Sequence, residues 1–101
     1  MVETAKVTLV TIVAAFEVEE RLVSDLGALG AKGYTRGQVS GHGVHGHRMA
    51  GLADAPNVRL EILASASLAA RILERIAQKY DGQPIVAYVH EVSATPREHF
   101  V

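Results

Sequence analysis

The chain has 101 residues, of which 49% are hydrophobic and only 5% aromatic, and these numbers predict one domain (residues 1–101) with an aliphatic core. The formal net charge of −1 argues against nucleic-acid binding through bulk electrostatics, and the absence of cysteine excludes disulfide and thiolate chemistry. The opening residues show no secretory signal pattern and no apolar run is long enough to span a bilayer, so the cytoplasm is the expected location.

The first half of the chain is expected to form a strand, a helix and a weaker strand. Residues 6–16 (KVTLVTIVAAF) are apolar on both alternating faces, which is typical of a central strand covered on both sides. Residues 17–31 carry an apolar stripe at helical spacing and acidic residues in the first turn, with Gly30 or Gly33 as the terminating glycine. Residues 34–40 (YTRGQVS) are more polar and indicate an edge strand.

A loop rich in glycine and histidine follows at residues 41–51 (GHGVHGHRMAG). It holds four of the nine glycines and three of the five histidines, so it is not a core segment. Glycines such as Gly41 and Gly43 allow positive φ and close backbone approach, and their N–H groups can converge on an anion. The alternative is a solvated hairpin loop in which the glycines serve only the turn geometry.

The second half of the chain is expected to form a strand, a helix and a strand. Residues 58–64 alternate between an apolar core face and a mixed face with an arginine and a glutamate. Residues 68–80 have an apolar stripe at helical spacing, and Ser65 or Ser67 can cap this helix. The remaining segments are a turn at 81–84 (DGQP), a strand at 85–92 (IVAYVHEV) and a tail at 93–101 that is expected to be only partly ordered.

This order of elements predicts an α+β fold, a ferredoxin-like βαββαβ sandwich. Its four-stranded antiparallel sheet carries both helices on one face. The other face would be bare in a monomer, yet the first and last predicted strands are apolar on both sides. An uncovered apolar sheet face indicates association, so we expect an obligate oligomer with ligands in the clefts between subunits.

Two segments resemble the PII signalling family. Residues 33–43 (GYTRGQVSGHG) match its pattern Gly-x-Thr-x-x-x-Val-x-Gly-x-Gly, and residues 57–63 (NVRLEIL) are similar to its strand containing Val-Lys-Ile-Glu-Ile. The loop at about residues 41–56 corresponds to the family's T-loop, and the turn at about residues 80–84 resembles a shortened B-loop. The finer resemblance is to the PII-like branch found in carboxysome-associated or bicarbonate-transporter gene clusters.

The resemblance implies a cytoplasmic homotrimer that binds an adenine nucleotide (ADP, AMP or ATP) in each cleft between subunits and needs no cofactor. The T-loop would contact a protein partner, such as a bicarbonate transporter or a carboxysome component. The nucleotide-binding residues carried over from the family are Thr35, Gly41, Gly43, Glu61, Ile62, Leu63, Asp81, Gly82 and Arg97.

The branch also suggests bicarbonate as a second ligand at the T-loop base. Gly41, His42 and Gly43 could donate N–H groups to it, and the guanidinium of Arg59 could bind two of its oxygens. The alternative for Arg59 is a surface ion pair with Glu61 that contributes little to stability.

Three positions lack a basic residue that many family members have. They are Val44, Gln83 and Thr95. Each charge-assisted phosphate contact contributes roughly 1.5–3 kcal/mol. Losing several of them therefore predicts that ADP or AMP binds at least as tightly as ATP.

Two other classes of function are weighed against this one. His42, His45 and His47 could converge on a metal ion, as in a protein resembling the trimeric CutA metal-tolerance family. Without a fixed scaffold, solvated histidines are the expected state, and no metal site is predicted. An enzyme would need a nucleophile beside a base, or paired carboxylates, and no spacing near the loop matches such a mechanism. We therefore predict a non-catalytic regulator; its partner and the sign of nucleotide–bicarbonate coupling stay open.

Overall fold

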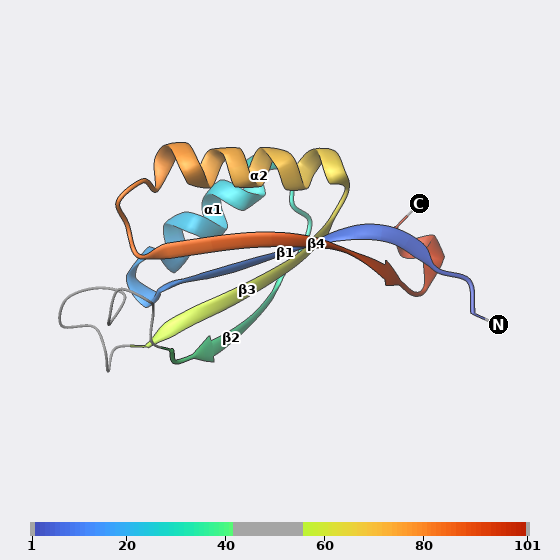
Figure 1. Cartoon of the computed structure of the whole chain (residues 1–101), viewed down its shortest axis with the longest axis horizontal. Helices are drawn as coiled ribbons and strands as arrows, with labels where there is room; N and C mark the ends of the chain where they lie inside the picture. Colours follow the sequence, from blue (N-terminus) through green and yellow to red (C-terminus); the bar gives the residue numbers. More distant parts are fainter. Residues whose placement is uncertain (1, 42–55, 101) are drawn as a thin grey trace.

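The computed structural model describes residues 2–41 and 56–100. Its elements are β1 (Ala5–Ala15), a 3-10 turn η1 (Phe16–Val18), α1 (Glu19–Leu29), β2 (Thr35–Val39), β3 (Asn57–Ala64), α2 (Ala66–Lys79), β4 (Ile85–Ala94) and a 3-10 turn η2 (Arg97–His99). The strands form one antiparallel sheet in the order β2-β3-β1-β4, with both helices on the same face (Figure 1). The predicted ferredoxin-like βαββαβ fold is confirmed.

The structure shows which of the predicted boundary residues end α1 and cap α2. Gly30 ends α1 with a φ of 109°, a left-handed conformation that glycine adopts without strain, so Gly30 rather than Gly33 is the terminating residue. Ser65 is the N-cap of α2, because its side-chain oxygen accepts a hydrogen bond from the N–H of Leu68 at 3.1 Å. This cap starts α2 two residues before the predicted position at residue 68.

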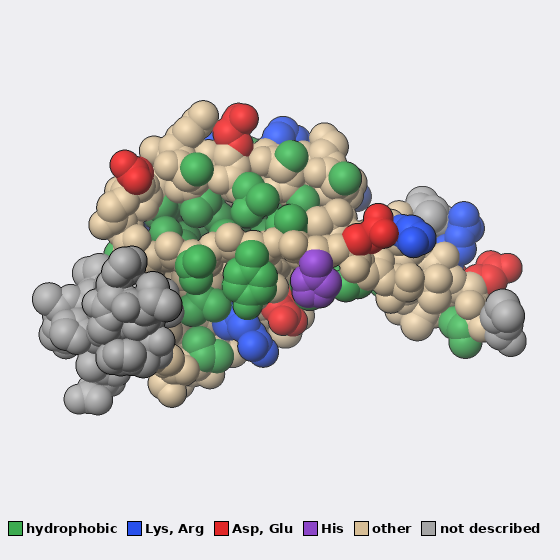
Figure 2. All heavy atoms as spheres, in the orientation of Figure 1, with side chains coloured by type: hydrophobic (Ala, Val, Ile, Leu, Met, Phe, Trp, Pro, Cys, Tyr) green, Lys and Arg blue, Asp and Glu red, His purple; other side chains and the backbone are tan. Residues whose placement is uncertain are grey.

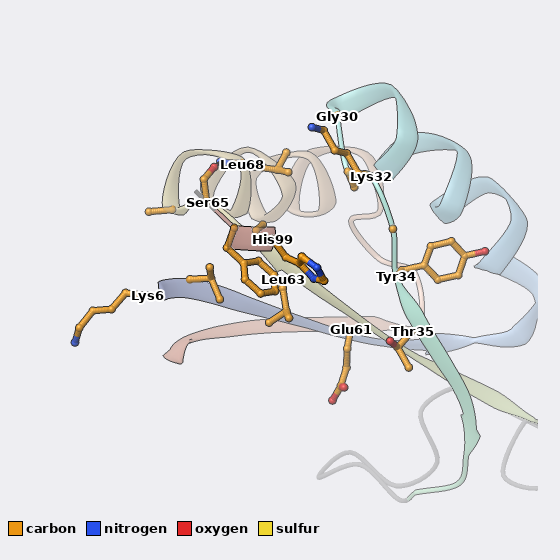
Figure 3. A pocket seen from close by; sticks show the side chains of 16 residues that line it. Lys6, Gly30, Lys32, Tyr34, Thr35, Glu61, Leu63, Ser65, Leu68 and His99 are labelled. Atoms are coloured by element: carbon orange, nitrogen blue, oxygen red, sulfur yellow. Dashed lines mark hydrogen bonds between the residues drawn. The ribbon is translucent and has the colours of Figure 1, made fainter. Parts of the chain in front are cut away.

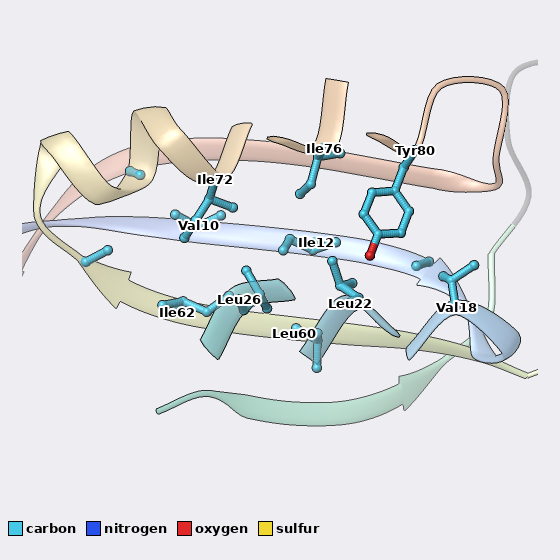
Figure 4. Packing of buried hydrophobic residues seen from close by; sticks show 13 residues of the cluster. Val10, Ile12, Val18, Leu22, Leu26, Leu60, Ile62, Ile72, Ile76 and Tyr80 are labelled. Carbon is cyan, nitrogen blue, oxygen red and sulfur yellow. The ribbon is translucent and has the colours of Figure 1, made fainter. Parts of the chain in front are cut away.

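The core lies between the helices and one face of the sheet (Figure 4). On the two central strands, every second residue points into it, which confirms the predicted core face of residues 58–64. The largest members of this core cluster are Val10, Ile12, Val18, Leu22, Leu26, Leu60, Ile62, Ile72, Ile76 and Tyr80. Burying these side chains supplies the main favourable term in folding.

The opposite face of the sheet is covered by no helix in the described part of the chain. The alternation of β1 and β4 and their register place Thr11 beside Tyr88 on this face, and Val13 beside Val86. Leu63, Val86 and Tyr88 are 46%, 43% and 50% exposed. Hydrophobic side chains are visible over the sheet as well as between the sheet and the helices (Figure 2). We call this side of the sheet the open face.

A buried polar contact joins the two helices. The Asp25 carboxylate accepts hydrogen bonds from Lys79 Nζ at 2.8 Å and from the Tyr80 hydroxyl at 2.5 Å. Burial by itself raises the pKa of Asp25, but the hydrogen bonds from Lys79 and Tyr80 outweigh it, and the pKa is lowered. Burial, followed by the bond to Asp25, raises the pKa of Tyr80 to about 12. The helical pattern predicted Tyr80 only as an apolar stripe residue and showed nothing of this contact.

Among the described residues, neither helix combines the length and the hydrophobicity that a membrane-crossing helix needs.

Candidate functional site

A groove of about 790 Å³ lies between the start of β2, the end of β3 and the N-terminus of α2 (Figure 3). Three of the residues predicted to bind nucleotide line it: Thr35, Glu61 and Leu63. Thr35 and Glu61 are direct partners on neighbouring antiparallel strands, so their side chains share the open face. The structure therefore brings together residues that are far apart in the sequence.

The lining of this groove combines apolar and polar side chains, which suits a ligand that has both kinds of group. Apolar side chains, among them Val7, Leu68 and Phe100, form part of its wall. The Glu61 carboxylate can accept hydrogen bonds from amino or hydroxyl groups. The tail residues His99 and Phe100 also line the groove, whereas the sequence predicted a tail that was only partly ordered.

A second pocket, of about 270 Å³, lies where β2 ends and β3 begins, at the base of the loop that the sequence predicts to be the T-loop. Gly41 and Arg59, two of the predicted bicarbonate residues, both line it. Arg59 Nε is 3.8 Å from Glu61 Oε2, and the two side chains are 52% and 39% exposed. An ion pair that is this long and this exposed contributes little. The surface pair considered from the sequence is present, and it leaves most donors of the guanidinium available to an anion.

The remaining residues that were predicted for this pocket belong to the T-loop. His42 and Gly43, together with Val44 and the metal candidates His45 and His47, lie outside the described residues. Among the residues that are described, no three potential metal ligands come together.

The turn that contains Asp81 and Gly82 lies beside the T-loop base. Two consecutive residues where β1 ends donate their N–H groups to the carbonyl oxygens of Pro84 and Pro56, each at 3.1 Å. Pro84 follows the turn, and Pro56 lies at the end of the T-loop, where the described part of the chain resumes. The two segments are therefore held at the same end of the sheet, as Figure 1 shows.

Arg97 and Ile62, which were also predicted to bind nucleotide, line neither the groove nor the second pocket. Arg97 is in η2, beyond the far end of β4, so one chain does not bring it to the Asp81 turn (Figure 1). Ile62 is 1% exposed and belongs to the core cluster. Its side chain therefore packs in the core and does not reach the groove.

Arg36 on β2 is engaged with α1. Its guanidinium donates to both carboxylate oxygens of Glu19, at 2.5 Å and 3.0 Å, and this hydrogen bonding raises the pKa of Arg36. A bidentate pair of this kind holds the guanidinium in a fixed orientation. Arg36 is thus a contact between sheet and helix, and it does not replace the phosphate-binding charge missing at position 83.

Arg21 on α1 is a residue that sequence reasoning missed. It donates a hydrogen bond to Gln83 Oε1 and stacks over the Tyr80 ring, with Cζ 5.0 Å from the ring centroid. Position 21 lies 62 residues from position 83, and no local pattern links the two.

Comparisons with known proteins agree with the fold and with the resemblance. Residues 7–99 match the family model for Nitrogen regulatory protein P-II. A PII-like signaling protein from Thermus thermophilus is 35% identical, with a TM-score of 0.80 over 98% of this chain and 99% of that chain. CPII, a nitrogen regulatory PII-like protein from Thiomonas intermedia, is 20% identical, with a TM-score of 0.77 over 91% of this chain and 96% of that chain.

GlnK from B. subtilis is also 20% identical, with a TM-score of 0.60 over 86% of this chain and 82% of that chain. A search of curated proteins found no match. The family match covers most of the chain and includes both segments that resemble the PII pattern, so the chain belongs to the P-II family of nitrogen regulatory proteins.

Proposed function

We propose that this protein is a trimeric regulator that binds adenine nucleotides in the clefts between its subunits and is not an enzyme. The observation that carries the proposal is the groove in which Thr35, Glu61 and Leu63 come together. Solved relatives support it, because CPII was solved with ADP, AMP and bicarbonate bound, and B. subtilis GlnK in complex with ATP. The P-II family match favours a regulator over a CutA-like metal-binding protein.

The separation of the predicted site residues supports a cleft between subunits. Within one chain, Asp81 lies at the T-loop end of the molecule and Arg97 at the other end. A neighbouring copy packed on the open face could supply the missing half of the site. The exposed side chains of Leu63, Val86 and Tyr88 give that face the apolar surface that such packing needs.

ADP and AMP are expected to bind at least as tightly as ATP in isothermal titration calorimetry. Gln83 and Thr95 carry no charge, and Arg36 is paired with Glu19, so these three positions supply no free cation for a third phosphate. Glu61→Gln is expected to weaken ADP binding by about tenfold, which corresponds to ~1.4 kcal/mol, because a charged acceptor is lost.

Glu74→Gln is the matched control for that substitution. Glu74 is an exposed glutamate on α2 that has no hydrogen bond or ion pair among the described residues, and its replacement should leave the affinity unchanged. A wild-type protein that binds neither ADP nor AMP would exclude the nucleotide function. A strong preference for ATP would show that the positive charge that binds the third phosphate comes from a basic residue other than Arg36.

Bicarbonate is proposed as the second ligand, in the pocket lined by Gly41 and Arg59. A monovalent oxyanion needs a few N–H donors and one cation, and the planar guanidinium of Arg59 can bind two oxygens at once. Arg59→Ala is expected to weaken bicarbonate binding by about tenfold or more, and Arg59→Lys, which keeps the charge without the fork, by less.

The measurement is a bicarbonate titration with and without ADP, on wild type and on both Arg59 variants. The anion and the nucleotide approach the same loop base, so their affinities should be coupled by about 1–3 kcal/mol. If bicarbonate changes neither its own binding signal nor the ADP affinity in wild type, the second-ligand proposal is wrong. The regulated partner is proposed to act in inorganic-carbon metabolism, as a bicarbonate transporter or a carboxysome component that contacts the T-loop.

A further inference from the structure

Helix α1 contacts the residues on both sides of the Asp81–Gly82 turn. Tyr80, which precedes the turn, is 1% exposed, and its hydroxyl donates to Asp25 at 2.5 Å. Gln83, which follows the turn, accepts a hydrogen bond from the guanidinium of Arg21. Arg21 also stacks on the Tyr80 ring at 5.0 Å. Both sides of the turn are thus tied to residues one helical turn apart on α1.

The turn has few other restraints of its own. Asp81 and Gly82 are exposed, and Gly82 has a φ of 79°. Two backbone hydrogen bonds hold it: the N–H of Gln83 donates to the carbonyl of Tyr80 at 3.0 Å, and the N–H of Ile85 donates to the carbonyl of Gln83 at 2.8 Å. Exposed turns with little buried apolar contact open at low free-energy cost. The side-chain contacts from α1 are therefore expected to determine the fraction of molecules in which the turn has this conformation.

We propose that Arg21 is a positioning residue for the nucleotide site, which holds the Asp81–Gly82 turn in its binding conformation through Gln83. The inference rests on the proposed function, because that function assigns the turn to the nucleotide. Gln83 suits this role through its amide oxygen, which accepts from a guanidinium; a lysine at position 83 would offer no acceptor and would repel Arg21. A turn that is already ordered binds a ligand with a smaller entropy loss.

The test compares wild type with Arg21→Ala, Gln83→Ala and the double variant. Amide hydrogen exchange of residue 83, whose N–H donates to the carbonyl of Tyr80, is measured without ligand, and ADP affinity is measured by calorimetry. Each single substitution is expected to speed exchange by about fivefold and to weaken ADP binding by about fivefold, because the opened turn must be ordered again on binding. The double variant should be no worse than Arg21→Ala alone, since that substitution already removes the contact with Gln83.

Arg71→Ala is the matched control, because Arg71 is an exposed arginine on α2 with no hydrogen bond or ion pair among the described residues. It should change neither measurement. Additive losses of ADP affinity in the double variant would assign Arg21 a direct ligand contact and overturn the positioning role. The positioning role would also be overturned by a second result. In the Gln83→Ala background, Arg21→Ala would weaken ADP binding more than AMP binding, and ATP binding most.

The hydrogen-exchange and ADP-affinity measurements also distinguish a failure of this inference from a failure of the proposed function. Faster exchange in Arg21→Ala with unchanged ADP affinity would overturn the positioning role and leave the nucleotide function standing. Unchanged exchange in Arg21→Ala would overturn it as well. A wild-type protein that binds no ADP would end the nucleotide function and the role of Arg21 in it together.

Discussion

Replacing Tyr88 with glutamate is expected to reduce the assembled protein to monomers. Tyr88 lies on the open face, half exposed, and the proposed trimer would bury this face between subunits. Each subunit would then bring a carboxylate into a face with exposed apolar side chains, and burying a charge there costs several kcal/mol. Light scattering or analytical ultracentrifugation at micromolar concentration would show the fall in mass.

Ser93→Glu is the matched control for the effect of Tyr88→Glu on assembly. Ser93 is exposed on the same strand, pairs with Lys6 in the register of β1 and β4, and by alternation faces away from the open face. A glutamate at position 93 should leave the mass unchanged. A monomeric wild type, or a Tyr88→Glu variant that keeps the wild-type mass, would show that the open face is not the interface.

Replacing Asp25 with alanine is expected to lower the free energy of unfolding by about 2–3 kcal/mol, because the buried hydroxyl of Tyr80 loses its acceptor. The Lys79 side chain is 45% exposed, so water can solvate its ammonium group after the change. This is why the expected loss is smaller than for a fully buried ion pair. Urea unfolding at a fixed protein concentration measures it, since association also affects apparent stability.

The double variant Asp25→Ala/Tyr80→Phe tests the cause of this loss. It removes donor and acceptor together, so it should be more stable than Asp25→Ala alone. If it is not, the unpaired hydroxyl is not what destabilises the fold. Glu74→Ala, at an exposed position of α2, should change the stability by less than about 0.5 kcal/mol.

The Asp25 contact also predicts how stability depends on acid. Although burial opposes it, the hydrogen bonds from Lys79 and Tyr80 lower the pKa of Asp25 below its ordinary value of 3.8. The contribution of Asp25 is therefore complete above that value and is lost as the pH falls through the folded-state pKa. Between about pH 6 and about pH 3, wild type should lose more stability than Asp25→Asn, which cannot titrate. Equal losses would contradict the assignment.

The candidate site could be predicted only where its residues belong to local patterns. The segment from Gly33 to Gly43 carries a recognisable spacing, and so does the strand with Glu61. Ile62 shows the limit of assigning binding residues by resemblance, because a match along a strand does not say on which face of the sheet each side chain lies. In the structure its side chain packs in the core, while its neighbours line the groove.

The sequence by itself determined the elements, the core face of the strands and the family, because alternation, helical spacing and caps act between residues close in the chain. Only the tertiary structure decided the contacts between distant residues. Strand register set Thr35 opposite Glu61, and helix packing brought Tyr80 to Asp25, 55 residues away. Hydrophobic periodicity shows that a side chain turns inward, but the polar partner that it meets there depends on how the elements pack against one another.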